Sequence, residues 1–236
     1  MIWFAVLLTS YVLALVLVQP EPESLKEAKL SIRDNIKSVK ATIGLGASLI
    51  VTFFFITDLT FSDVNQKALA LLAFNNITEL YILWPIQAVT HTFIHAHWQH
   101  LLMNLTVLAL LSVYERRVNA KRFLAVYIVG SLTSLLSVFF YSEPVLLCGA
   151  SAGIMALAAG FVVDHENLTL KEWLCAVLLC FFLVAVFSIQ AEMESERIDL
   201  FNFTIDHIGH VLGAVGGILY CRLKTRANIS EDGAGS

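Results

Sequence analysis

Charged residues are scarce in this chain of 236 residues: they make up 14% of it, whereas hydrophobic residues make up 58%. The mean hydropathy of +0.76 is far above that of an ordinary soluble domain. Basic clusters with interleaved aromatic residues are lacking, so nucleic acid is not an expected partner. The four cysteines lie in or beside apolar runs, and none has zinc-ligand spacing with a histidine. We therefore expect no cofactor and no metal, and assign the cysteines to hydrophobic packing.

The apolar residues are gathered into seven segments. Most of these segments approach the roughly 20 residues that a helix needs to cross about 30 Å of hydrocarbon. The chain is therefore predicted to be an all-α, multi-pass integral membrane protein in contact with the lipid bilayer. No Lys or Arg precedes the first segment, so it lacks the charged start of a signal peptide and is expected to stay as an additional helix. The segments are 2–18, 41–57, 101–113, 123–140, 149–163, 173–190 and 204–220.

The positions of Lys and Arg predict the orientation in the membrane. Basic residues gather in 19–40, in the turn at 114–122 and in the tail after residue 220. All three regions fall on one side if the segments alternate, and the positive-inside rule makes that side cytoplasmic. The N-terminus is then outside and the C-terminus is cytoplasmic. The expected parts are an extra N-terminal transmembrane helix at 1–19, a cytoplasmic linker at 20–40, a six-helix core at 41–222 and a cytoplasmic tail at 223–236.

Polar side chains within apolar segments are costly, and each is a candidate for function. Ser151 lies in "CGASAGIMALAAG", where the next strongly polar residue is Asp164. The segment 149–163 has 15 residues and spans only about 22 Å at 1.5 Å per residue. We expect this helix to begin below the outer surface, so that the preceding loop dips into the membrane and water reaches Ser151.

Small residues predict a partner for this serine. Gly209, Gly213 and Gly217 recur every four residues, and this spacing lets two membrane helices approach closely. Ala152 and Ala156 begin a comparable ridge beside Ser151, which Ala159 continues. Packing the two ridges would bring the Ser151 hydroxyl within reach of His210, the arrangement of an activated nucleophile. The simpler alternative is that Ser151 caps its helix while His210 bonds a carbonyl group.

Two further polar residues lie at the start of the segment 101–113, one immediately before it and one within it. His100 and Asn104 are four residues apart, so they share a helical face. Both can donate hydrogen bonds to a developing oxyanion, together with the backbone amide of Ser151. The alternative is that they serve as hydrogen-bonding contacts between helices.

Four short motifs follow one another between residues 91 and 217. They are H-x4-H-x3-N at His95, His100 and Asn104, E-x-R at Glu115 and Arg117, G-x-S-x at Gly149, Ala150, Ser151 and Ala152, and H-x2-G-x3-G at His210, Gly213 and Gly217. In this order and spacing the chain resembles the rhomboid family of intramembrane serine proteases. The resemblance implies a six-helix catalytic core, here with one additional N-terminal helix in a 1+6 arrangement. It also implies a Ser151–His210 dyad that cleaves peptide bonds in or near transmembrane segments of membrane proteins, with His100 and Asn104 serving the oxyanion.

Two positions depart from the family pattern. Ala152 follows the serine where glycine is usual, and Met155 stands where many members carry a tyrosine that packs against the catalytic histidine. Independently of the family, Asp206 lies one turn before His210 and is a candidate to orient its imidazole. His207 is the rival base, but counting from it does not place glycines at the motif positions. A prokaryotic plasma (inner) membrane is the expected location.

Two other functions remain open from the sequence. One is a rhomboid-like protein with weak or no catalytic activity that binds membrane clients, which the methionine at position 155 would favour. The other is a zinc-dependent seven-helix membrane hydrolase, because four histidines cluster between residues 91 and 100. The chain lacks an H-E-x-x-H motif and has no acidic ligand among these histidines, which counts against the zinc enzyme.

Overall fold

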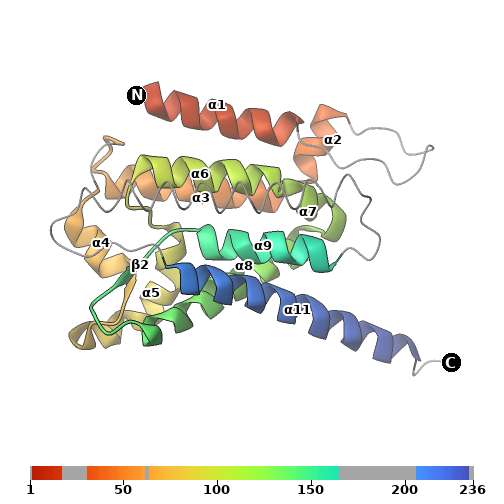
Figure 1. The fold of residues 1–236 in the computed structure, drawn as a ribbon. Coiled ribbons are helices and arrows are strands. Elements are labelled where there is room, and N and C mark those ends of the chain that lie inside the picture. Colours follow the sequence, from red (N-terminus) through yellow and green to blue (C-terminus); the bar gives the residue numbers. More distant parts are fainter. Residues whose placement is uncertain (1, 18–30, 62–63, 165–205, 234–236) are drawn as a thin grey trace.

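The computed structural model describes residues 2–17, 31–61, 64–164 and 206–233, and this part of the chain is mainly helical (Figure 1). The elements are α1 (Ile2–Leu17), α2 (Ile32–Lys37), α3 (Lys40–Ile56), α4 (Gln66–Leu72), β1 (Phe74–Asn75), η1 (Thr78–Leu83), α5 (Trp84–Thr90), η2 (His91–Phe93), α6 (Trp98–Leu110), α7 (Ser112–Val118), α8 (Ala120–Ser134), η3 (Leu135–Phe140), β2 (Leu146–Leu147), α9 (Ser151–Val163) and α11 (His207–Gly233).

Each predicted apolar segment within the described residues contains a helix. The segment 173–190 lies outside them. The helix α11 continues to Gly233, past the boundary expected at residue 222, and α2 lies within the stretch expected to be a linker. In the part of the chain that is described, Ala120–Phe140 is long and apolar enough to cross a membrane, with a mean hydropathy of 2.1. The helices Lys40–Ile56 and Ser151–Val163 are apolar but shorter.

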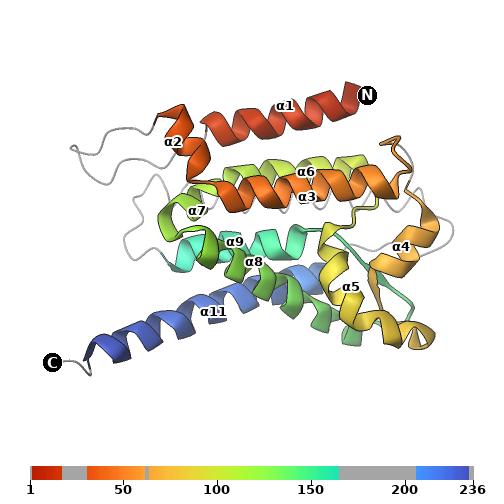
Figure 2. The same cartoon turned by 180° about the vertical axis from the view of Figure 1, so that it is seen from behind.

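The helices form a bundle in which α8, α9 and α11 pack on one another. Next to them lie α3 and α6, and α1 lies against α6 on the outer side (Figures 1 and 2). The elements α4, α5 and the two short strands gather at one end of the bundle. At the opposite end lie α2, α7 and the C-terminal end of α11 (Figure 2).

The described residues of the long connection between α3 and α6 include several short helices and a strand. Its strand β1 pairs antiparallel with β2, with Phe74 opposite Leu147 and Asn75 opposite Leu146. The side chain of Asn76 extends this contact, because its Oδ1 accepts a hydrogen bond of 2.9 Å from the Val145 amide. The segment that leads into Ser151 is therefore held in place by the connection that precedes α6.

The E-x-R motif acts at the other end of the bundle, where Glu115 of α7 caps α3. Its Oε1 accepts from the Ala41 amide at 2.8 Å, and its Oε2 accepts from the amide and the hydroxyl of Thr42, both at 2.8 Å. The first amides of a helix have no partner within it, and the helix dipole favours a negative charge there. The buried carboxylate of Glu115 therefore joins two helices that are distant in the sequence.

The N-terminal helix is anchored by polar contacts as well as by apolar packing. The Tyr11 hydroxyl donates a hydrogen bond of 2.5 Å to the carbonyl oxygen of Thr42. At the end of α1, the carbonyl oxygen of Leu15 accepts hydrogen bonds from Asn35 at 3.3 Å and from Arg116 at 3.2 Å. These donors satisfy a carbonyl group that the helix end leaves without an internal partner.

Candidate active site

The structure brings Ser151 and His210 together. The Ser151 Oγ lies 2.7 Å from the His210 Nε2, a normal hydrogen-bond distance for these atoms. Ser151 is the first residue of α9, and His210 lies in the first turn of α11. Ser151 is buried and His210 is half-buried. A hydroxyl that donates to a neutral imidazole can lose its proton to that ring as it attacks an electrophile.

Glycines of α11 allow this approach. A Cβ atom added to Gly213 would lie 2.6 Å from the carbonyl oxygen of Ala152, and one added to Gly217 would lie 2.7 Å from that of Ala156. Real Cβ atoms are essentially never so close to backbone atoms. The two helices are thus in direct backbone contact, in the register of the glycine and alanine ridges.

Gly149 shapes the turn that precedes α9. Its φ of +110° lies in a region that residues with a Cβ rarely adopt. Its amide donates a hydrogen bond of 2.9 Å to the carbonyl oxygen of His91. A Cβ atom at this position would lie 2.6 Å from Cε1 and 2.7 Å from Nε2 of His100. The absence of a side chain therefore lets the imidazole of His100 pack directly against the backbone two residues before Ser151.

Asn104 of α6 lies beside His95, which precedes this helix. Its side-chain Nδ2 is 3.0 Å from the Nε2 of His95, and the rings of His95 and His100 meet edge to face with centroids 4.9 Å apart. All three side chains are buried. The residues that the sequence assigned to the oxyanion and its support therefore form one cluster, which reaches Gly149 through His100.

Asp206 immediately precedes α11 and caps it. Its Oδ1 accepts hydrogen bonds from the Gly209 amide at 2.7 Å and from the Tyr141 hydroxyl at 2.9 Å, and its Oδ2 accepts from the Ser137 hydroxyl. The sequence analysis did not foresee Tyr141 or Ser137, because they are 65 and 69 residues away in the chain. These contacts join η3 and the start of the loop before Ser151 to the turn that carries His210.

The remaining predicted residues lie farther from this pair or make other contacts. Met155 is half-buried, one turn beyond Ser151, and packs against the hydrophobic core. His207 is exposed, and its ring centroid is 6.5 Å from that of His210. Glu115 caps α3, and Arg117 follows it on α7. Among residues 2–17, 31–61, 64–164 and 206–233, no group of three His, Cys, Asp or Glu side chains is arranged to hold a metal ion.

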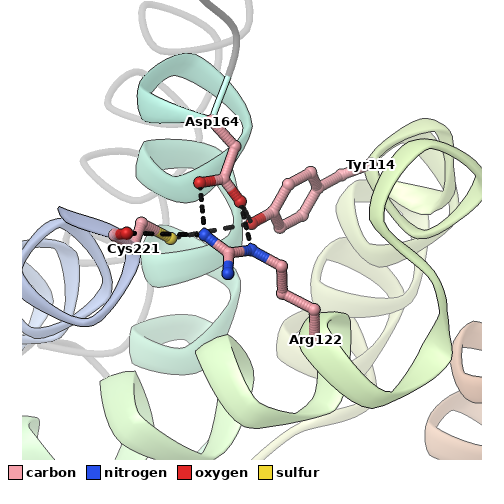
Figure 3. A network of polar contacts seen from close by, with 4 residues as sticks. All are labelled: Tyr114, Arg122, Asp164 and Cys221. Carbon is pink, nitrogen blue, oxygen red and sulfur yellow. Dashed lines mark hydrogen bonds and ion pairs between the residues drawn. The ribbon is translucent and has the colours of Figure 1, made fainter. Parts of the chain in front are cut away.

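A second polar cluster lies at the opposite end of α9 (Figure 3). The guanidinium group of Arg122 makes two hydrogen bonds of 2.6 Å to the carboxylate of Asp164, and the Tyr114 hydroxyl donates to the same carboxylate at 2.5 Å. Arg122 also reaches the carbonyl oxygen of Cys221 at 3.5 Å. The cluster therefore joins α7, the start of α8, the end of α9 and the middle of α11, away from Ser151.

Removing the charge of Asp164 is expected to destabilise the fold. Burial by itself would raise the pKa of the Asp164 carboxyl, but the hydrogen bonds from Arg122 and Tyr114 hold that pKa below its ordinary value. Because the ionised form is favoured in the folded state, its contribution is complete at neutral pH and is lost as the pH falls through the lowered pKa. We expect Asp164→Asn to lower the free energy of unfolding at pH 7 by about 3 kcal/mol, since it leaves the guanidinium group of Arg122 without its carboxylate partner. Unfolding in mixed micelles measures this change.

An exposed ion pair provides the matched control for that variant. Lys37 and Asp34 lie 3.8 Å apart on α2 with both side chains more than half exposed. Asp34→Asn should cost less than about 1 kcal/mol, because exposed pairs contribute little. Equal losses for the two variants, or a loss for Asp164→Asn that persists unchanged at the lowest pH, would contradict the assignment.

Comparison with known proteins identifies the fold family. A family model for the Rhomboid domain matches residues 83–227. No curated protein matches the chain. The matched region covers more than half of the chain and includes both Ser151 and His210. The chain therefore belongs to the rhomboid family and is an integral membrane protein.

Proposed function

We propose that this protein is an active intramembrane serine endopeptidase with Ser151 as nucleophile and His210 as general base. The observation that carries the proposal is the 2.7 Å contact between Ser151 Oγ and His210 Nε2. Ser151 attacks the carbonyl carbon of the scissile peptide bond while its proton moves to His210 Nε2. The imidazolium then protonates the leaving amine, and an acyl-enzyme remains. Water, deprotonated by His210, attacks this ester and releases the carboxylate product, which regenerates the serine.

The tetrahedral intermediates carry a negative oxygen that needs hydrogen-bond donors. The proposed donors are His100, Asn104 and the backbone amide of Ser151. The contact of the His100 ring with Gly149 supports this assignment, because it places an imidazole against the turn that carries Ser151. Preorganised donors of this kind are often the largest single contribution to catalysis. The reaction proposed here uses no metal or cofactor.

Asp206 is proposed to support the dyad from one turn before His210. Its carboxylate is held by Tyr141, Ser137 and the Gly209 amide, so its charge stays at the start of α11. A fixed negative charge at this place favours the imidazolium that forms during the reaction. Met155 fills the place where related chains carry an aromatic ring, and we propose that the Asp206 contacts compensate by fixing the histidine turn.

The proposed substrates are membrane proteins, cleaved in or near a transmembrane segment. The thirteen residues of α9 span only about 20 Å, so Ser151 lies below one membrane surface. We further propose a 1+6 arrangement of spans, with 1–19 as the additional helix, 20–40 as a cytoplasmic linker, 41–222 as the catalytic core and 223–236 as a cytoplasmic tail. The N-terminus is placed outside the plasma membrane of a prokaryotic cell, in agreement with the basic residues of α7 and those of α11 after residue 220.

A fluorophosphonate probe tests the proposed function directly. The purified full chain in detergent is incubated with the probe, digested, and analysed by mass spectrometry. We expect one covalent adduct per chain, located on the peptide that contains Ser151. A folded protein that stays unlabelled would instead indicate an inactive protein that binds membrane clients. An adduct on another serine would contradict the assignment of the nucleophile.

A further inference from the structure

The side-chain amide of Asn104 is fixed from one side. Asn104 is 1% exposed, and its Nδ2 lies 3.0 Å from the Nε2 of His95. Its Oδ1 is buried and accepts no hydrogen bond from the described residues. A buried acceptor without a partner costs about 1–3 kcal/mol, so an orientation that tolerates this cost must be imposed by its surroundings.

His95 imposes that orientation through its tautomer. The His95 side chain is fully buried, and its Nδ1 lies 3.3 Å from the carbonyl oxygen of Phe93. A carbonyl oxygen only accepts hydrogen bonds, so Nδ1 carries the ring proton and Nε2 is left as an acceptor. The group of Asn104 that faces Nε2 must then be the NH₂ group. A rotated amide would place its Oδ1 against the lone pair of Nε2.

One amide hydrogen of Asn104 remains for another acceptor. An NH₂ group has two hydrogens, and His95 uses one of them. The rigid helix α6 fixes the Cα atom of Asn104, and His95 fixes the rotation of its amide group. The ring of His95 also packs against that of His100, the other proposed side-chain donor. A single buried histidine therefore contacts both side chains assigned to the oxyanion.

We propose that His95 is a positioning residue for the oxyanion site, holding the NH₂ group of Asn104 in the orientation that donates to the intermediate. This inference rests on the proposed function of Ser151 and Asn104. It assigns to His95 a contribution to the rate of the chemical step and none to the binding of substrate. Displacing a reacting group by about 1 Å can cost about 100-fold in rate, so loss of one rotational constraint is expected to be measurable.

The test measures the rate of fluorophosphonate labelling at Ser151 against probe concentration, which separates the maximal rate from the half-saturating concentration. His95→Leu removes the acceptor and keeps an apolar group of similar size, and it should lower the maximal rate about 10- to 100-fold with little change in half-saturation. Asn104→Ala should lower it about 100-fold or more. The double variant His95→Leu/Asn104→Ala should be no slower than Asn104→Ala alone, because His95 acts through Asn104.

Two further variants make the result specific. His95→Gln places a carbonyl oxygen near the position of Nε2 and should recover most of the rate that His95→Leu loses. His91→Leu is the matched control, because His91 is also buried but its Nδ1 bonds the carbonyl groups of Gln87 and Ala88. Any decrease in labelling rate caused by His91→Leu should therefore multiply with the decrease caused by Asn104→Ala in the double variant.

The outcomes separate this inference from the proposed function. If the wild type is labelled at Ser151 but the losses of His95→Leu and Asn104→Ala multiply, the positioning role of His95 is wrong and the dyad stands. A folded His95→Gln that is as slow as His95→Leu also overturns the inference, and melting curves of each variant establish that it is folded. No labelling of the wild type at Ser151 overturns both.

Discussion

Replacing Ser151 with alanine should abolish fluorophosphonate labelling, and replacing His210 with alanine should slow it by about 10⁴-fold. The hydroxyl oxygen is the nucleophilic atom of Ser151, and in the proposed mechanism its proton passes to His210 Nε2, which lies 2.7 Å away. Without the base, the attacking oxygen stays a neutral hydroxyl group, which is a weak nucleophile near neutral pH. Labelling rates of the purified variants, measured from pH 5 to 9, provide the comparison.

His207 is the internal control for this prediction. It lies on the same helix, and its ring centroid is 6.5 Å from that of His210, but its side chain is exposed. His207→Ala should therefore label at nearly the rate of the wild type and keep the same pH dependence. If His210→Ala is labelled rapidly and His207→Ala is not labelled, the assignment of the base is reversed, while Ser151 keeps its role.

The register of α11 against α9 was predictable because membrane helices associate by close packing. Gly213 and Gly217 repeat at the spacing of one helix face, and Ala152 and Ala156 repeat in the same way on the other helix. Small residues at this spacing allow two helix backbones to come into contact, so they predict a contact between segments that are 61 residues apart (Gly213 and Ala152). In the structure, the carbonyl groups of these alanines face the glycines, as the spacing predicted.

Other features of the site leave no comparable pattern in the sequence. Asp206 contacts Tyr141 and Ser137 through one hydrogen bond each, and both residues are more than 60 positions away from it in the sequence. Single polar contacts have no periodicity, and the connection around them contains short 3₁₀ helices and strands of two residues. The pairing of Asn104 with His95 also depends on the turn between η2 and α6, and helical spacing alone does not predict its path.

A single methyl group on Gly213 should strongly slow fluorophosphonate labelling at Ser151. In Gly213→Ala the new Cβ atom would lie 2.6 Å from the carbonyl oxygen of Ala152, so α11 must move away from α9. Ala152 follows Ser151 directly, and His210 lies one turn before Gly213, so this displacement acts on the serine and histidine contact itself. We expect a loss of about 100-fold in labelling rate and about 1–3 kcal/mol in the free energy of unfolding.

Two other glycines distinguish a specific displacement from general damage. Gly217→Ala meets the backbone of Ala156 at 2.7 Å, so it should destabilise the fold similarly but slow labelling less, because it acts one turn farther from His210. Gly44→Ala in α3 has no neighbouring atom within 4 Å of its new Cβ and should be as stable and as fast as the wild type. If Gly213→Ala retains the full labelling rate, the helices tolerate separation without loss of the dyad. The close contact would then contribute to stability alone, and the alignment of Ser151 with His210 would have to come from the cap formed by Asp206.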